Sequence, residues 1–193
     1  MKNLCVYCGS NAGRIADYAL AAKQLARALV SKGIGLVYGG ASVGIMGKIA
    51  DSVLEEGGNV VGIIPKGLFK KEVAHTGITE LREVDSMHER KALMADLSDG
   101  FIALPGGFGT IEEIFEIITW SQLGMHKKPC GLLNVCHYYD KLIGFLDHAV
   151  SEQFIKATHN STILVDECPD ALLEKFEVYN APETVKWIGR KNT

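Results

Sequence analysis

Segments typical of β-strands and of α-helices alternate along this sequence from one end to the other. Short, mainly apolar runs predict strands at residues 4–7, 35–38, 60–64, 81–84, 101–104, 130–135 and 163–165. Between and after them, segments with helical spacing and helix-ending glycines predict helices at residues 18–31, 44–56, 87–97, 111–123, 139–151 and 171–179. Such alternation is the pattern of a parallel sheet whose strands are joined by crossover helices.

Most of the predicted strands are continuous apolar runs, such as Phe-Ile-Ala-Leu at residues 101–104. A strand without polar alternation is buried on both faces, which favours a sheet covered by helices on both sides. We therefore predict an α/β fold: a single doubly wound, Rossmann-like domain over residues 1–193, with a mainly parallel sheet. Residues 66–80 are the least regular segment and are predicted to form a loop over a site.

Three glycine-containing segments follow predicted strands: residues 8–11 (Cys-Gly-Ser-Asn), 38–47, and 105–110 (Pro-Gly-Gly-Phe-Gly-Thr). Ligands of doubly wound sheets bind at the carboxyl ends of the strands, where these segments fall. A glycine-rich turn that leads into a helix brings unpaired backbone N–H groups close to an anion. Together the three segments predict a composite site for a phosphorylated ligand, with Thr110 capping the last helix.

Two common phosphate-binding motifs are absent. The sequence before Gly47-Lys48 has Ser42 where a P-loop needs glycine, and Ile49 follows where it needs serine or threonine. No GxGxxG motif follows a predicted strand, which lowers the expectation of a dinucleotide and favours a mononucleotide by elimination.

The charge and the sequence pattern argue against nucleic-acid-binding, membrane and secreted proteins. With 20 basic and 23 acidic side chains, a net charge near −3 gives no general attraction for nucleic acid or anionic membranes. No apolar run is long enough to span a membrane, and no secretory signal is recognisable, so we expect a cytoplasmic protein. The 5 cysteines are odd in number, as expected of reduced thiols. Cys5 and Cys8 form a CxxC pair, but in a strand their side chains should point to opposite faces.

Two charged residues are the candidates for catalysis. Arg90 lies near the start of the helix predicted after residue 86, and Glu113 lies in the first turn after the glycine segment. The alternatives are a solvated helix charge for Arg90 and a capping-box or helix-dipole carboxylate for Glu113.

The segment PGGFGTIEE at residues 105–113 resembles the PGGxGTxxE motif of the LONELY GUY (LOG) family of cytokinin riboside 5′-monophosphate phosphoribohydrolases. The resemblance covers nearly the whole chain and includes the Cys-Gly-Ser start, the Tyr-Gly-Gly segment at 38–40, Met-His-Glu-Arg-Lys at 87–91 and Tyr138-Tyr139. It implies cleavage of the N-glycosidic bond of a nucleoside 5′-monophosphate, with no cofactor and no metal.

By this resemblance Arg90 and Glu113 fall on the catalytic arginine and glutamate of the family. The residues that we assign to substrate binding lie in the same motifs: Gly9, Ser10, Gly39, Gly40, Met87, Lys91, Pro105, Gly106, Gly107, Gly109 and Thr110. The chain departs from the family pattern at Ala41, where a third glycine is usual, and at Cys136-His137, where Asp-Gly is common. The second departure leaves the base preference open.

Two other functional classes remain open at this stage. Glycine turns also bind phosphate without chemistry, so a non-catalytic nucleotide-binding or carrier protein of related Rossmann type is the alternative. A DNA-processing relative is disfavoured by the net acidity.

The helix predicted over 111–123 has apolar residues on two sides, which indicates a homodimer or larger homo-oligomer. Ile111, Ile114, Phe115 and Ile118 form one stripe, expected to pack on the sheet, while Ile117 and Trp120 would face water on the other side. We expect a second copy of the chain to cover that second side.

Overall fold

The computed structural model describes residues 1–69 and 74–182; residues 70–73 and 183–193 lie outside the description. Within these ranges the chain forms one sheet of 7 parallel strands, in the order β4-β3-β2-β1-β5-β6-β7. The strands are β1 (Asn3–Tyr7), β2 (Gly35–Tyr38), β3 (Val60–Pro65), β4 (Glu80–Val84), β5 (Phe101–Ala103), β6 (Cys130–Leu133) and β7 (Ile163–Asp166). The parallel, doubly wound prediction is confirmed.

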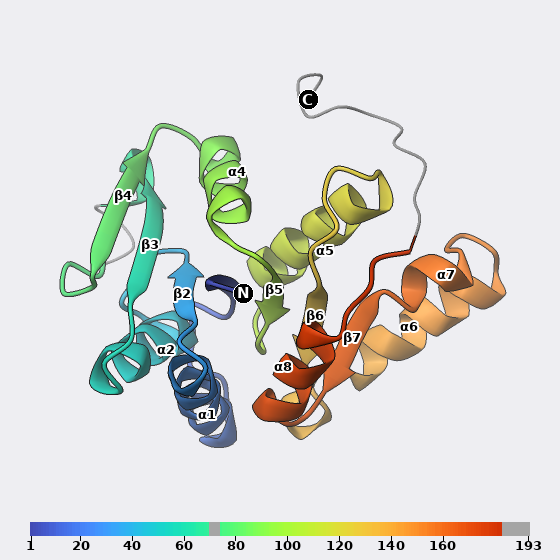
Figure 1. Ribbon diagram of the computed structural model, residues 1–193, viewed down its shortest axis with the longest axis horizontal. Coiled ribbons are helices and arrows are strands. Elements are labelled where there is room, and N and C mark those ends of the chain that lie inside the picture. Colours follow the sequence, from blue (N-terminus) through green and yellow to red (C-terminus); the bar gives the residue numbers. More distant parts are fainter. Residues whose placement is uncertain (70–73, 183–193) are drawn as a thin grey trace.

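Helices connect the strands and cover both faces of the sheet (Figure 1). They are α1 (Asp17–Ser31), α2 (Gly44–Glu55), α3 (Lys66–Phe69), α4 (Met87–Leu97), α5 (Phe108–Gln122), α6 (Asp140–Ser151), α7 (Ala157–Asn160) and α8 (Pro169–Glu177), with a 3₁₀ turn η1 (Val135–His137). Every predicted strand and helix is present with small shifts at its ends. The sequence prediction missed α3, α7 and η1, because elements of one turn are too short to show a helical period.

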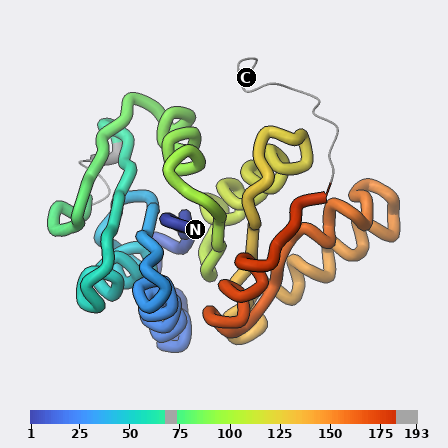
Figure 2. Tube along the Cα trace, in the orientation of Figure 1, coloured from blue at the N-terminus to red at the C-terminus, as the bar shows by residue number. Residues whose placement is uncertain are grey.

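The first strand lies at the centre of the sheet, and the chain reverses its winding direction there. Strands β2, β3 and β4 extend the sheet on one side of β1, and β5, β6 and β7 extend it on the other. Figure 2 shows this division as blue-to-green chain on one side of the N-terminus and yellow-to-red chain on the other. The reversal between β1 and β5 is the switch point at which doubly wound sheets bind ligands.

Two hydrophobic clusters bury the two faces. One joins α1, α2 and α8 to the sheet through side chains such as Leu25, Ile49 and Leu172. The other joins α4, α5 and α6 through side chains such as Met94, Ile114 and the partly buried Ile143.

The two N-terminal cysteines illustrate the division between the faces. Cys5 belongs to the cluster under α5 and Cys8 to the cluster under α1, so the predicted divergence of their side chains is confirmed. Burial raises the pKa of both thiols, which keeps them protonated and unreactive.

The start and the rotation of α5 differ from the sequence prediction. The helix begins at Phe108 with Gly107 at the N-cap position, so Thr110 is a first-turn residue and its predicted capping role is wrong. The residues that α5 buries are Thr110, Ile114 and Ile117. Ile117 is 1% exposed in the single chain, so the prediction that it faces water is also wrong. Almost every side of α5 carries apolar residues, and hydrophobicity alone therefore did not fix which side meets the sheet.

Candidate functional site

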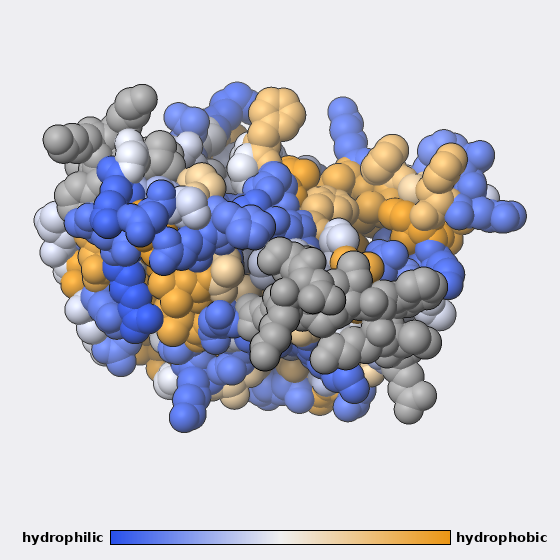
Figure 3. Space-filling model, turned by 90° about the horizontal axis from the view of Figure 1, so that it is seen from above, coloured by the Kyte–Doolittle hydropathy of each residue, from blue (hydrophilic) through white to orange (hydrophobic). Residues whose placement is uncertain are grey.

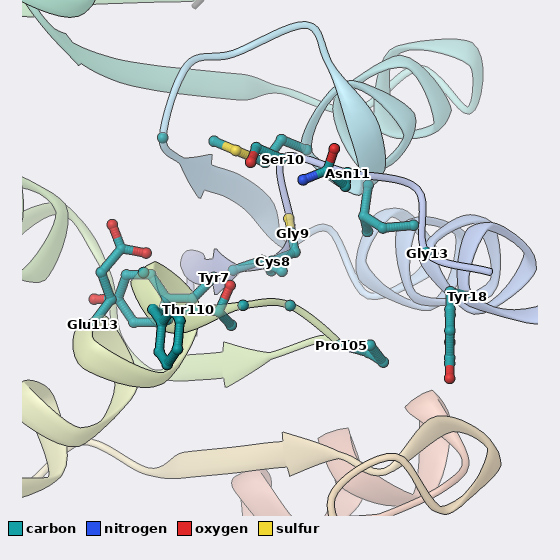
Figure 4. Close-up of a pocket in the computed structure, with 18 of the residues that line it drawn as sticks. Tyr7, Cys8, Gly9, Ser10, Asn11, Gly13, Tyr18, Pro105, Thr110 and Glu113 are labelled. Carbon is teal, nitrogen blue, oxygen red and sulfur yellow. The ribbon is translucent and has the colours of Figure 1, made fainter.

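A pocket of about 520 Å³ lies at the carboxyl ends of β1 and β5, at the switch point of the sheet. Its wall comes from the end of β1 and the loop through Gly13, from Gly39 after β2, from α4, and from residues 105–113. Figure 4 shows Glu113, Tyr7 and Thr110 toward one end of this pocket and Gly13 and Tyr18 toward the opposite end. We call residues 105–110 the glycine turn.

The glycine turn presents backbone donors to the pocket. The first hydrogen bond of this helix runs from the Ile111 N–H to the Gly107 carbonyl. In the part of the chain that the structure describes, the N–H groups of residues 106–110 donate no hydrogen bond to a protein acceptor. Unpaired N–H groups at the positive end of a helix dipole form a site for an anion such as phosphate.

The glycine turn packs directly against the first loop of the chain. The Gly9 N–H donates to the Pro105 carbonyl at 3.1 Å. A Cβ atom added to Gly106 would lie 2.1 Å from Thr110 Oγ1 and 2.8 Å from the Gly9 nitrogen. Glycine at position 106 therefore allows a packing that no side chain could fit.

The Arg90 side chain is buried and held at the carboxyl ends of β2 and β3 rather than solvated. It is 6% exposed, its Nε donates to the Ile63 carbonyl at 3.1 Å, and its Nη2 donates to the Gly39 carbonyl at 3.2 Å. A Cβ on Gly39 would lie 1.9 Å from Nη2, so the glycine makes room for the guanidinium. The remaining nitrogen, Nη1, faces Glu113. This geometry rules out the alternative of a solvated helix charge.

Glu113 lies beside Arg90 in the same pocket. One carboxylate oxygen, Oε1, is 3.6 Å from Arg90 Nη1, and the side chain is 13% exposed. The capping-box alternative fails because Thr110 does not cap the helix. The predicted first-turn position of Glu113 is also wrong: α5 begins at Phe108 and holds no acidic residue in its first turn, which removes the basis of the helix-dipole alternative. We call Arg90 and Glu113 the charged pair.

Tyr7 is part of the pocket wall on the same side and adds no charge. Burial raises its pKa well above the usual range, and neighbouring Cys5 and Glu113 raise it further. The phenol therefore stays protonated.

The neighbouring residues Lys91 and Glu112 lie outside the pocket wall. Lys91 Nζ contacts Glu112 Oε1 at 2.7 Å and Glu116 Oε2 at 3.0 Å. Burial lowers the Lys91 pKa, but its hydrogen bonds with the two glutamates outweigh that effect and leave the pKa raised. These contacts join α4 to α5 and so fix the spacing between the elements that carry the charged pair.

The structure thus gathers most of the predicted site residues and leaves some outside. The pocket wall includes Gly9, Ser10, Gly39, Arg90, Pro105, Gly106, Gly107, Gly109, Thr110 and Glu113. Gly40, Met87 and Lys91 are not part of it. Met87 contacts Arg90 through its sulfur at 3.8 Å, and Gly40 has a positive φ and packs on Ile64.

Asn11, which belongs to the predicted segment 8–11, lines the pocket, whereas sequence reasoning did not assign Tyr18 and Tyr138, which also line it. The Tyr-Tyr pair at 138–139 was a recognisable signal for the last of these. None of the described residues of segment 66–80 lines the pocket; Ala74 instead pairs with Ala41, beyond the end of β2.

The described residues hold no group of three or more His, Cys, Asp or Glu side chains arranged for a metal ion. Across the same ranges, every helix is too short or too polar to span a bilayer.

Comparison with known sequences finds a family model described as "possible lysine decarboxylase", which matches residues 46–176. A protein of Oryza sativa subsp. japonica named cytokinin riboside 5′-monophosphate phosphoribohydrolase LOG is 51% identical over 178 residues, covering 92% of this chain and 74% of that protein. The similarly named LOG1 of Arabidopsis thaliana is 49% identical over 191 residues, covering 99% of this chain and 89% of that protein.

Comparison with solved structures shows the same fold in more distant proteins. The molybdenum cofactor carrier protein of Chlamydomonas reinhardtii matches with a TM-score of 0.68 at 19% identity, over 92% of this chain and 99% of that one. The DNA processing protein A of Streptococcus pneumoniae matches with a TM-score of 0.58 at 12% identity, over 93% of this chain and 63% of that one. At these identities the similarity shows the fold alone.

Proposed function

Since the chain belongs to the LONELY GUY (LOG) family, we propose that it is a phosphoribohydrolase, which cleaves the N-glycosidic bond of nucleoside 5′-monophosphates. The observation that carries the proposal is one pocket with a buried charged pair and a helix N-terminus of unpaired N–H groups. The products are a free base and ribose 5-phosphate. The names of the relatives support an N6-modified adenine, the cytokinin class, as the base.

Glu113 is the side chain that acts in the cleavage of the N-glycosidic bond. As the bond from the anomeric carbon to the base nitrogen breaks, its electron pair leaves with the base, and positive charge develops on the sugar. A carboxylate beside that carbon stabilises the charge and takes a proton from the water whose oxygen forms the new bond. The base nitrogen gains a proton, so the reaction consumes one water.

Arg90 positions this carboxylate. Two of its nitrogens are fixed by the Ile63 and Gly39 carbonyls, and the third points at Glu113. A guanidinium held in this way attracts the carboxylate of Glu113 and fixes its direction. In the same position Arg90 is available to ribose oxygens.

The glycine turn anchors the 5′-phosphate. Arg90 is the one basic side chain among the described residues that line the pocket, and it lies beside Glu113. The phosphate therefore rests on backbone N–H groups, the helix dipole and the Thr110 and Ser10 hydroxyls. Binding energy at this remote group orients the bond that breaks.

Incubating the protein with a panel of nucleoside 5′-monophosphates and identifying the products by chromatography tests the proposal. We expect adenine-type bases to be released together with ribose 5-phosphate, fastest from the N6-prenylated substrate. If the protein binds monophosphates but releases no base from any of them, the alternative of a non-catalytic nucleotide-binding or carrier protein is correct instead.

We further propose a homodimer or larger homo-oligomer that uses α5, now through the stripe that the sequence assigned to the sheet, because Ile117 of the other side is buried within the chain. Phe108 is 98% exposed, and Ile111, Phe115 and Ile118, which continue the same stripe of the helix, are half-buried in the single chain. Figure 3, which views the molecule from above, shows apolar atoms exposed over α5 and α6. Light scattering at micromolar concentration is expected to give at least twice the monomer mass. A fully active monomer would contradict this interface.

A further inference from the structure

The two tyrosines that immediately precede α6, Tyr138 and Tyr139, both donate hydrogen bonds to the connection between β5 and α5. Tyr138 Oη donates to the Gly106 carbonyl at 2.5 Å, and Tyr139 Oη donates to the Leu104 carbonyl at 2.7 Å. Tyr139 is 1% exposed and belongs to the core, whereas Tyr138 is 41% exposed and lines the pocket. The two tyrosines therefore hold the same connection from two places: Tyr139 from the core and Tyr138 from the pocket wall.

The backbone before Tyr138 is strained. Cys136 has φ 48° and His137 has φ 60°, a left-handed conformation that costs roughly 1–2 kcal/mol for a residue with a side chain. Neighbouring contacts hold the turn in place: the Tyr139 N–H donates to Asn134 Oδ1 at 2.7 Å, and Asn134 Nδ2 donates to Asp140 Oδ1 at 2.8 Å. Strain that the surroundings maintain is common where a functional group must be aimed.

We infer that Tyr138 is a positioning residue for phosphate recognition, an inference that rests on the proposed function. The carbonyl and the N–H of one peptide unit point in opposite directions. By holding the Gly106 carbonyl, Tyr138 sets the orientation of the peptide unit that carries the Gly107 N–H. That N–H is one of the unpaired donors of the glycine turn.

Tyr138 also links the glycine turn to the loop on the opposite side of the pocket. Its ring packs edge-on against Tyr18, with centroids 5.7 Å apart. Tyr18 in turn supports Gly13, where an added Cβ would lie 2.5 Å from the Tyr18 ring. Through these contacts Tyr138 joins the two walls between which the phosphate lies, so it fixes both the direction of the donors and the distance between the loops.

The test compares Tyr138→Phe with Tyr139→Phe, since each removes one hydroxyl and keeps the ring. Titration calorimetry with ribose 5-phosphate, and with ribose as the phosphate-free control, measures the phosphate contribution. We expect Tyr138→Phe to weaken ribose 5-phosphate binding about tenfold, the usual scale for one lost hydrogen bond. In turnover it raises KM for the monophosphate while kcat stays within about twofold. Tyr139→Phe is expected to lower the melting temperature more and the affinity less.

Two results would overturn the inference in distinguishable ways. If Tyr138→Phe folds and binds ribose 5-phosphate as tightly as the unchanged protein, Tyr138 does not position the turn, and the proposed function stands. If the unchanged protein binds ribose 5-phosphate no better than ribose, the phosphate site itself is absent, and the proposed anchoring fails together with the inference.

Discussion

The charged pair and the glycine turn, the two working parts of the pocket, are built from different parts of the protein. The charged pair consists of side chains from α4 and α5, and carbonyls from β3 and the end of β2 hold its arginine. The glycine turn is one continuous segment whose working groups are backbone N–H atoms. In the proposed mechanism, a buried arrangement of side chains therefore serves the bond-breaking step, and a local backbone motif anchors the phosphate.

This difference predicts that mutations in the charged pair and mutations in the glycine turn have separable effects. Changes in the charged pair are expected to act on turnover, because the proposed mechanism places its groups at the reacting atoms. Changes in the glycine turn are expected to act on the affinity for phosphate, because the proposed mechanism uses the turn only to anchor the 5′-phosphate.

The largest effect is expected for Glu113→Gln. The amide keeps the shape but carries no charge and accepts no proton, so turnover falls at least about 10²-fold. Glu112→Gln is the matched control, because Glu112 pairs with Lys91 outside the pocket. Steady-state base release from both variants checks the assignment, which is wrong if the Glu112 variant loses more activity with its fold intact.

Arg90→Ala is expected to lower turnover by a similar factor and also to lower stability. The substitution leaves the Ile63 and Gly39 carbonyls without their donor and Glu113 without its cation. Loss of buried partners lowers the free energy of unfolding by about 1–3 kcal/mol, so the melting temperature drops. The circular dichroism spectrum is expected to remain that of the folded protein. Unchanged turnover in a folded Arg90→Ala variant would show that Arg90 takes no part in the bond-breaking step.

Gly106→Ala is expected to weaken binding of the monophosphate at least about tenfold, since the new Cβ displaces Thr110 or the first loop. Gly109→Ala is expected to lose less affinity, because a Cβ there meets no atom within 4 Å. Calorimetric titration of both variants with ribose 5-phosphate ranks them. Equal losses would mean that packing behind the turn is irrelevant to anchoring.

The smallest effect is expected for His137→Gly, a change in the turn that places Tyr138. Glycine relieves the left-handed strain but gains freedom in the unfolded chain, so the net stabilisation is about 0.5–1 kcal/mol. Urea unfolding measures it. A large destabilisation would show that the His137 contacts with Asp140 and Glu167 outweigh the strain.

The comparison of the charged pair with the glycine turn also explains what the sequence could predict. The glycine turn is contiguous, so its place after β5 and before α5 followed from residues 101–114 alone. The partners of Arg90 at positions 39 and 63 come together only in the folded sheet, and no local pattern indicates them. The capping role of Thr110 and the exposure of Ile117 were wrong because both depend on where α5 begins and how it rotates on the sheet.

The most direct test of the account measures kcat/KM for an N6-prenylated adenosine 5′-monophosphate and for the same nucleoside without its phosphate. The account predicts release of the free base and ribose 5-phosphate from the monophosphate, at least about 10²-fold more efficiently than base release from the nucleoside, since the backbone anchor contributes only to the former. Equal efficiencies for the two substrates would contradict the claim that the glycine turn anchors the phosphate for catalysis by the charged pair.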